Sequence, residues 1–209
     1  HAGPVGRRRF VRVHLQVAAT AEVLGRWPDP WSAVSPVERD RAQAFHGADD
    51  ARDFLAAHLL ARECVTALTG ETTVHLEQRC TECGGPHGKP FVLGLSDACV
   101  SWSHSHGHVG AVAADVPVGV DVEARHRQHD IERLVRRTAT PEEGAAILAG
   151  DDPDDAYLRM WVAKEALVKV GAITLGEFGR TDVRSGTYGG FTLTVTEPEG
   201  LAVGLAVQA

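Results

Sequence analysis

Two short segments place the strongest limits on the fold of this chain. Residues 119–123 have the sequence Gly-Val-Asp-Val-Glu, and residues 161–169 have the sequence Trp-Val-Ala-Lys-Glu-Ala-Leu-Val-Lys. Asp121 and Glu123 are two residues apart, so on a β-strand their side chains point to the same face. Glu165 and Lys169 are four residues apart, so on an α-helix they share one face. Together the two segments predict a strand and a helix that hold a divalent cation against a phosphate.

Each segment also has a plainer interpretation when it is taken alone. Asp121 and Glu123 suit a solvated strand edge. Glu165 and Lys169 suit a surface ion pair one helical turn apart. We expect Trp161 to anchor the helix in the core, since a large aromatic side chain buries much apolar area.

Composition limits the class of protein. The chain has 209 residues, which fits one large domain or two small ones. Its apolar fraction of 44% is ordinary for a globular protein, so a core can form. The net charge of −7 argues against nucleic acid as a partner. No apolar run is long enough to span a bilayer, and residues 1–4 lack the apolar core of a secretory signal, so we expect a cytoplasmic protein without a membrane partner.

Sequence patterns predict an alternation of strands and helices. Ser35 and Pro36 mark a helix start, and Gly70 and Gly171 mark helix ends. The His-rich residues 103–108 are expected to form a polar connection between two strands. The predicted strands cover about 10–18, 74–76, 99–103, 109–114, 118–123 and two or three segments of 181–208, and the predicted helices cover about 49–69, 130–138, 141–149 and 154–170.

This order of elements predicts an α+β fold. A strand, helices and strands are followed by a second set of strand, helices and strands. We therefore expect two similar α+β lobes, an N-terminal lobe of residues 1–117 and a C-terminal lobe of residues 118–209, with a site between them. No clear sequence repeat supports a duplication.

The four cysteines suggest a second kind of site. Without a secretory signal, a disulfide framework is not expected. Cys80 and Cys83, followed by His87, resemble half of a zinc site, but a second Cys-x-x-Cys pair is absent. The alternative is a tight turn with free thiols. His104, His106 and His108 alternate as well, but a zinc site there would need a further ligand.

Taken together, the motifs resemble those of one enzyme family. The chain is similar to the 4′-phosphopantetheinyl transferases, specifically the larger monomeric type that activates peptide and polyketide synthetases. The resemblance rests on the 119–123 and 161–169 segments, on Gly-Lys-Pro at 88–90 and on Ser-His-Ser at 103–105. Residues 35–45 and 54–62 are also similar. After Lys169 the chain departs from the family's usual Gly-x-Gly-Leu stretch.

The resemblance implies a pseudodimer of two α+β lobes, with coenzyme A bound between them in a monomer. The enzyme would move the 4′-phosphopantetheine group of coenzyme A to a serine of an apo acyl or peptidyl carrier protein and release 3′,5′-ADP. Which carrier it serves is left open.

The resemblance also assigns roles to residues. Asp121, Glu123 and Glu165 would hold Mg²⁺, with Mn²⁺ as an alternative. Glu165 is expected to be a metal ligand, the general base, or both, and Asp121 and Lys169 complete the catalytic set. The residues expected to contact the coenzyme are Arg39, Arg41, Lys89, Pro90, Ser103, His104, Lys164 and Lys169. For Arg39, Arg41 and Lys164 the alternative is a solvated side chain on the helix surface.

Two other functions stay open at this point. A magnesium-dependent phosphohydrolase acting on a nucleotide would use the same acids, but it leaves the 88–90 and 103–105 segments unexplained. A non-catalytic module that binds carrier proteins would not need all three acids and Lys169.

Overall fold

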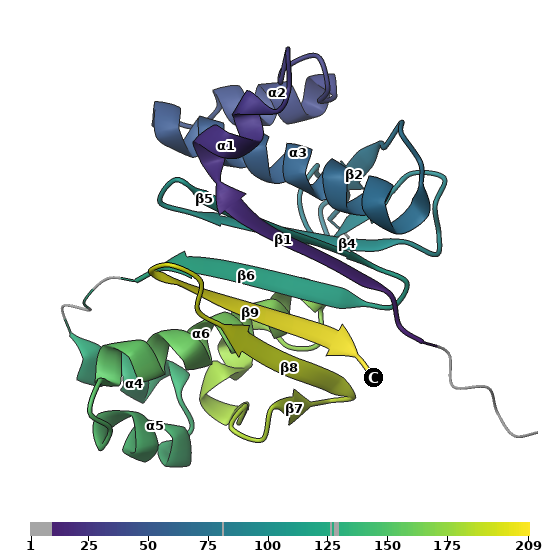
Figure 1. The fold of residues 1–209 in the computed structure, drawn as a ribbon. Helices are drawn as coiled ribbons and strands as arrows, with labels where there is room; N and C mark the ends of the chain where they lie inside the picture. Colours follow the sequence, from purple (N-terminus) through teal and green to yellow (C-terminus); the bar gives the residue numbers. More distant parts are fainter. Residues whose placement is uncertain (1–9, 81, 126, 128–129) are drawn as a thin grey trace, which may run out of the picture.

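The two larger sheets of this α+β protein are antiparallel, and each is covered by one long helix (Figure 1). The computed structural model describes residues 10–80, 82–125, 127 and 130–209. The N-terminal segment 1–4, which lacks the pattern of a secretory signal, lies outside the described residues. In the described part of the chain, no helix combines the length and the apolar character needed to cross a bilayer.

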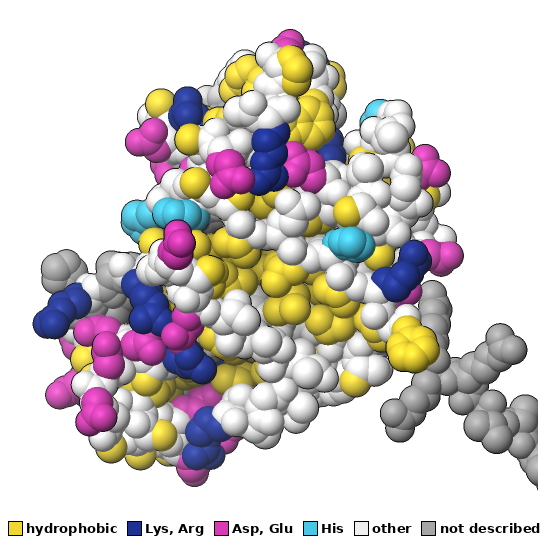
Figure 2. Space-filling model, viewed as in Figure 1, with side chains coloured by type: hydrophobic (Ala, Val, Ile, Leu, Met, Phe, Trp, Pro, Cys, Tyr) yellow, Lys and Arg dark blue, Asp and Glu magenta, His cyan; other side chains and the backbone are white. Residues whose placement is uncertain are grey.

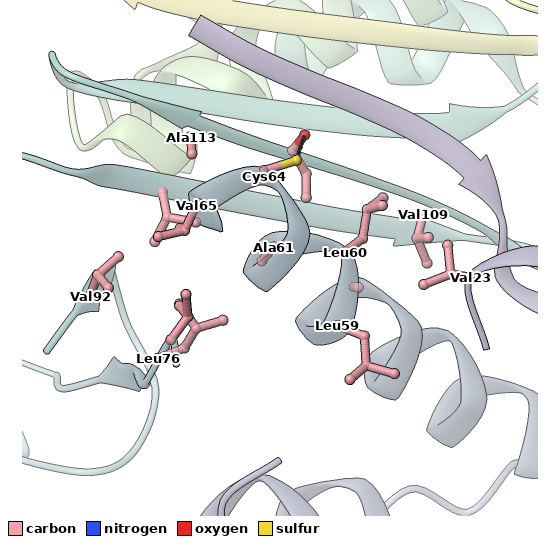
Figure 3. Packing of buried hydrophobic residues seen from close by; sticks show 14 of the residues in the cluster. Val23, Leu59, Leu60, Ala61, Cys64, Val65, Leu76, Val92, Val109 and Ala113 are labelled. Atoms are coloured by element: carbon pink, nitrogen blue, oxygen red, sulfur yellow. Dashed lines mark hydrogen bonds between the residues drawn. The ribbon is translucent and has the colours of Figure 1, made fainter. Parts of the chain in front are cut away.

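The first sheet has the strand order β1-β5-β4 and is covered by helix α3. Its strands are β1 (Val13–Ala19), β4 (Cys99–Ser105) and β5 (His108–Ala114), and α3 spans Ala48–Thr69. Gly70 ends α3 in a left-handed conformation, as its sequence predicts. Figure 3 shows side chains of α3, among them Leu59, Leu60 and Val65, packed between this sheet and a small β2–β3 sheet.

The elements around α3 are short. Helices α1 (Thr20–Gly25) and α2 (Pro36–Gln43) precede it, and strands β2 (Leu76–Gln78) and β3 (Pro90–Val92) follow it. Ser35 caps α2 and forms a reciprocal capping box with Glu38, so the predicted helix start is confirmed. The sequence patterns did not predict α1 or β3.

The second sheet has the strand order β6-β9-β8-β7 and is covered by helix α6. Its strands are β6 (Val118–Ala124), β7 (Thr187–Tyr188), β8 (Phe191–Thr196) and β9 (Leu201–Gln208), and α6 spans Pro153–Val170. Helices α4 (Ile131–Thr138) and α5 (Pro141–Leu148) and a 3-10 helix, η1 (Leu175–Arg180), pack beside α6. The sequence patterns predicted α4, α5 and α6 but not η1.

Strand β6 lies beside β4, where the two sheets meet (Figure 1). The Ser101 hydroxyl accepts a hydrogen bond from the Val120 amide at 3.1 Å. A cluster of buried valines, including Val118 and Val122 of β6, fills the space between the sheets. Figure 2 shows hydrophobic side chains gathered in the middle of one face, with most charged side chains above and below them.

The connection between β4 and β5 corrects one prediction. Residues 103–105 continue the strand instead of forming a polar loop, and Ser105 pairs with His108. His106 and Gly107 both have positive φ angles, 48° and 79°, which allows a hairpin turn of only two residues. The consequence is that Ser103 and Ser105 share one face of β4, while His104 lies on the other.

The halves of the chain resemble each other only in outline. The first sheet uses strands between residues 13 and 114, and the second uses strands between 118 and 208. Each sheet carries one long helix, but the strand orders and the accessory helices differ. The lobe boundary at 117/118 and the pseudodimer arrangement therefore stay predictions.

Candidate active site

Two serines of β4 hold the two acids of β6. The Ser103 hydroxyl donates to Oδ1 of Asp121 at 2.8 Å, and the Ser105 hydroxyl donates to Oε2 of Glu123 at 2.7 Å. Alternate side chains of β4 thus face alternate side chains of β6, and both acids point to the same side of β6, as their spacing predicts. Burial raises the pKa of Glu123, and the hydrogen bond from Ser105 only partly opposes this rise.

A glycine brings helix α6 against these acids. A Cβ atom at Gly119 would collide with the carbonyl oxygen of Ala166 and lie 2.9 Å from the Val170 nitrogen. Only glycine leaves room for so close a contact between helix and strand. As a result Lys169 reaches β6, and its Nζ donates to Oδ1 of Asp121 at 2.8 Å and to the Trp102 carbonyl at 3.4 Å.

Glu165 is the least compensated acid of the group. Within the described part of the chain, its carboxylate makes no hydrogen bond or ion pair. Burial, followed by repulsion from Asp121, raises the pKa of Glu165 to about 7, and attraction to Lys169 opposes only part of this shift. A carboxyl group that titrates near neutral pH in a partly buried site is a candidate general base.

These groups line one cavity of about 400 Å³, which we call the acidic cavity. Helices α2, α3 and α6 and strands β2, β4 and β6 all contribute to its wall. Of the predicted site residues it brings together Arg41, Ser103, His104, Asp121, Glu123, Glu165 and Lys169.

The acidic cavity suits a hard divalent cation. Oδ2 of Asp121 is buried and has no hydrogen-bond partner among the described residues. An unpaired buried carboxylate oxygen is costly, and a bound cation would compensate it. Carboxylate oxygens are the ligands that Mg²⁺ and Mn²⁺ take, so Asp121, Glu123 and Glu165 fit such an ion.

His104 reaches the acidic cavity from the opposite face of β4. Its ring packs edge-on against Phe45, with centroids 6.5 Å apart. Burial lowers the pKa of His104, and the charge of Asp53 opposes this only in part. An anion bound beside the ring would favour the protonated form, as the sequence predicts for a phosphate contact.

Arg41 separates the acidic cavity from a second one of about 530 Å³. We call this second space the neighbouring cavity. Arg41 and Trp102 line both cavities, as does Gln78, to which the Arg41 guanidinium donates a hydrogen bond. The guanidinium also lies 5.0 Å from the centre of the Phe54 ring. Burial lowers the pKa of Arg41, so an anion in either cavity would offset the cost of burying this charge.

A buried ion cluster fixes the helix that carries Arg41. Glu38, three residues earlier on α2, accepts hydrogen bonds from Arg62 at 2.7 and 2.9 Å and lies 2.6 Å from Nδ1 of His58. Burial raises the pKa of Glu38, but the hydrogen bonds to His58 and Arg62 outweigh it and hold the pKa well below its usual range. This cluster links α2 to α3 and so fixes the position of α2, and with it the position of Arg41 at the cavity wall.

Three further predicted contacts lie outside the walls of both cavities. Arg39 is exposed and donates to the Val34 carbonyl at 3.3 Å. Lys89 donates to the Val170 carbonyl at 3.2 Å, so it touches the end of α6 right after Lys169. Pro90 lies in β3 and pairs with Gln78. A role for these three stays a prediction.

Lys164 corrects one prediction, because it is neither a ligand contact nor a solvated side chain. It is fully buried on the side of α6 that faces α4, α5 and η1. Its Nζ donates to Oε2 of Glu143 at 2.6 Å and to the carbonyls of Thr138 and Phe178 at 2.9 and 2.8 Å. The 100° step between consecutive helix residues separates it from Glu165.

Aromatic side chains in the acidic cavity were missed by sequence reasoning. Phe45, Phe54, Trp102 and Trp161 line it. Trp161 was expected only as a core anchor; it packs against Phe178 at 5.4 Å and lines the cavity as well. Trp161 is four residues before Glu165, so the two share one helix face. This spacing could have predicted that Trp161 lines the cavity.

Comparisons with known proteins point to one family. Residues 117–202 match the sequence model of the 4′-phosphopantetheinyl transferase superfamily. The chain is 26% identical over 140 residues to the 4′-phosphopantetheinyl transferase Sfp of Bacillus subtilis (strain 168), which covers 66% of this chain and 60% of that protein. It is 27% identical over 142 residues to the 4′-phosphopantetheinyl transferase ffp of Bacillus subtilis, with the same coverage. The matched region thus spans 60% of the length of these relatives.

Proposed function

We propose that this chain, whose residues 117–202 carry the domain of the 4′-phosphopantetheinyl transferase superfamily, transfers the 4′-phosphopantetheine group of coenzyme A to a serine of an apo acyl or peptidyl carrier protein. The observation that carries the proposal is the acidic cavity, whose wall brings Asp121, Glu123 and Glu165 together with Lys169, Arg41 and His104. Three acids beside three basic side chains suit a diphosphate held through a cation.

The reaction exchanges one phosphoester bond for another. The serine oxygen of the carrier attacks the β-phosphorus of coenzyme A, and the bond from that phosphorus to the bridging oxygen breaks. The leaving group is 3′,5′-ADP. Glu165 takes the serine proton in this proposal: its pKa is raised to about 7 in the cavity without a cation, and it acts as the base where its carboxylate is not engaged as a metal ligand.

A divalent cation held by Asp121 and Glu123, with Glu165 as a third ligand where it does not act as the base, would neutralise the charge of the diphosphate. We propose Mg²⁺, with Mn²⁺ as an alternative, since both accept carboxylate ligands. Ser103 and Ser105 hold two of these acids in place by the hydrogen bonds described above. Fixed ligands need no reorganisation as charge moves to the leaving group.

The basic side chains bind and orient the coenzyme. Lys169, whose Nζ is 2.8 Å from Oδ1 of Asp121, places a positive charge beside the acids and suits an α-phosphate oxygen. His104 and Arg41 line the same cavity and suit the 3′-phosphate. The neighbouring cavity, reached past Arg41, offers room for the nucleoside, and Lys89 lies close enough to the end of α6 to add a contact.

One chain supplies every group in this proposal. The acids come from the second sheet and α6, while Ser103 and His104 come from the first sheet. We therefore propose a monomer in which two lobes form one site. A phosphohydrolase is not favoured, because the curated relatives are transferases and hydrolysis assigns no role to the 88–90 segment.

Intact mass spectrometry of an apo carrier protein tests the proposal. The carrier is incubated with this protein, coenzyme A and Mg²⁺, and a parallel sample contains EDTA. We expect a mass gain of one phosphopantetheine group, which EDTA abolishes. Peptide, polyketide and fatty-acid carriers are compared, because each offers a serine to the same reaction.

Two results would overturn the proposal. Cleavage of coenzyme A without a gain in carrier mass would assign the cavity to hydrolysis. Intact coenzyme A with every carrier type, together with carrier binding, would assign a non-catalytic role.

A further inference from the structure

The loop between β2 and β3 gathers three side chains that the proposed reaction does not use. The donor atoms of Cys80, Cys83 and His87 all lie within 4.8 Å of one another. Cys83 Sγ is 3.0 Å from Nε2 of His87. All three are absent from the walls of both cavities, and Cys83 and His87 are exposed.

The backbone of this loop is shaped around the sulfur atoms. The Cys80 amide donates to the Gly85 carbonyl, and the Gly84 amide donates to the Cys80 carbonyl, both at 2.9 Å. These bonds close a tight turn. The Gly85 amide points at Cys83 Sγ at 3.4 Å, and the backbone amides of Cys83 and Glu82 are directed at the Cys80 sulfur. Amides aimed at sulfur stabilise a thiolate, the form that binds metal.

Glycine leaves room for the sulfur and the imidazole to approach each other. A Cβ atom at Gly85 would lie 3.2 Å from both Cys83 Sγ and His87 Nε2. Gly84 and Gly88 have φ angles of +71° and +99°, which bend the chain back on either side of His87. The three donors therefore converge because of the local backbone and not through packing against the core.

We propose that Cys80, Cys83 and His87 bind a thiophilic divalent cation, Zn²⁺, with water in the fourth position. Two thiolates and one imidazole are the ligands that zinc prefers. Ligand atoms around a tetrahedral zinc ion lie about 3.3–3.8 Å apart. Cys83 and His87, at 3.0 Å, would therefore move slightly apart, and the other donor atoms, within 4.8 Å, need only small shifts. On binding, the two thiol protons leave to solvent and two zinc–sulfur bonds form.

This zinc site is distinct from the cation of the acidic cavity. Carboxylates select hard ions such as Mg²⁺, whereas thiolates select Zn²⁺. The zinc would act on the loop. The carbonyl of Gly88, next to His87, accepts a hydrogen bond from Nε2 of Gln78 at 2.7 Å, and Gln78 in turn contacts Arg41. A metal that fixes the loop would thus also fix the residue that separates the two cavities.

Metal content measures the site directly. The reduced full-length protein is incubated with Zn²⁺, desalted and analysed for zinc, beside Cys83→Ser, His87→Gln and the control Cys99→Ser. Cys99 is half-buried in β4 and lies outside the cluster. We expect one zinc ion per chain in the unmodified protein and the control, and its loss in both cluster variants. Far-ultraviolet circular dichroism checks that each variant is folded.

Cobalt distinguishes this site from the acidic cavity. Co²⁺ replaces Zn²⁺ in thiolate sites and gives a sulfur-to-metal charge-transfer band that carboxylates cannot give. We expect the band in the unmodified protein and in Asp121→Ala, and its absence in Cys83→Ser. Equal zinc content in unmodified protein, Cys83→Ser and His87→Gln would overturn the proposal. So would a Cys80–Cys83 disulfide, seen by peptide mass in freshly purified protein that takes up no zinc. None of these readouts depends on transfer activity.

Discussion

Lys164 and Glu165 are neighbours in the sequence, but their surroundings are opposite. Lys164 is fully buried, and its ammonium group has a carboxylate and two carbonyls as partners. Glu165 is partly exposed, its described surroundings include two other acids, and its pKa is raised to about 7. The difference shows that the two faces of helix α6 have different roles. The charge of Lys164, whose hydrogen bonds are satisfied within the protein, stabilises the fold, whereas the carboxylate of Glu165 is available to a ligand.

The largest effect is expected on the reactive face of α6. Glu165→Gln removes the proton acceptor and should slow transfer by about 10²–10⁴-fold, measured as the initial rate of carrier mass gain. Glu142→Gln, an exposed site on α5, is the control and should leave the rate unchanged. A titration with Mg²⁺ then separates the two roles of Glu165. If the inactive Glu165→Gln protein binds Mg²⁺ as tightly as the unmodified protein, Glu165 is the base and not a metal ligand. A near-normal rate would remove Glu165 from the catalytic set.

The opposite effect is expected on the buried face. Lys164→Met leaves Glu143 buried without its counterion and should lower the free energy of unfolding by about 3–5 kcal/mol, measured by urea denaturation. The rate of transfer per folded molecule should not change. Replacing Glu143 as well should restore only part of the loss, because Glu143 also accepts from the amides of Thr140 and Val183. A lost rate with normal stability would mean that Lys164 acts in the cavity after all.

Gly119→Ala tests whether the two faces are coupled through strand β6. The added methyl group has no space beneath Ala166, so the helix must shift, at a cost of about 1–3 kcal/mol in unfolding free energy. We expect transfer to fall as well, because the shift moves Lys169 away from Asp121. Gly25→Ala is the matched control, since a Cβ atom there meets nothing within 4 Å. If Gly119→Ala kept both stability and rate, the close contact would have no functional meaning.

The smallest effect is a change in how stability depends on pH. The pKa of Glu165 is raised from 4.5 to about 7 on folding, so its ionisation costs stability as pH rises through this window. Without metal, Glu165→Gln should therefore stabilise the protein above pH 7 by about 1–2 kcal/mol, a figure reduced for partial exposure. The gain should vanish near pH 4. Thermal unfolding with EDTA at both pH values measures it, and a gain that is independent of pH would argue against the raised pKa.

Local patterns predicted the parts of the site that lie on one element. The spacing of Asp121 and Glu123, and that of Glu165 and Lys169, placed each pair on one face because strand and helix periods are fixed. The long helices α3 and α6 and their glycine ends followed for the same reason. The resemblance to a family supplied the reaction, which spacing alone left open.

Features that depend on contacts between elements were not predicted. The burial of Lys164 follows from Glu143, 21 residues away, and no local pattern marks that pair. The serines that hold the acids were placed in a loop, because two left-handed residues at 106–107 make the hairpin turn shorter than its polar sequence suggests. The role of Phe54 in the cavity wall depends on how α3 packs over β4, which the period of the helix does not fix.

Because of the serine contacts between β4 and β6, the geometry of the site depends on how the two sheets are aligned. Ser103 meets Asp121 and Ser105 meets Glu123 in one register only. Moving one strand along the other by the length of a single residue, about 3.3 Å, would take both serine hydroxyls out of hydrogen-bonding distance of the acids. A small displacement of one sheet along the other, such as one caused by a tightly bound carrier, would therefore break the hydrogen bonds to the acids before it disturbed the packing of the hydrophobic cores.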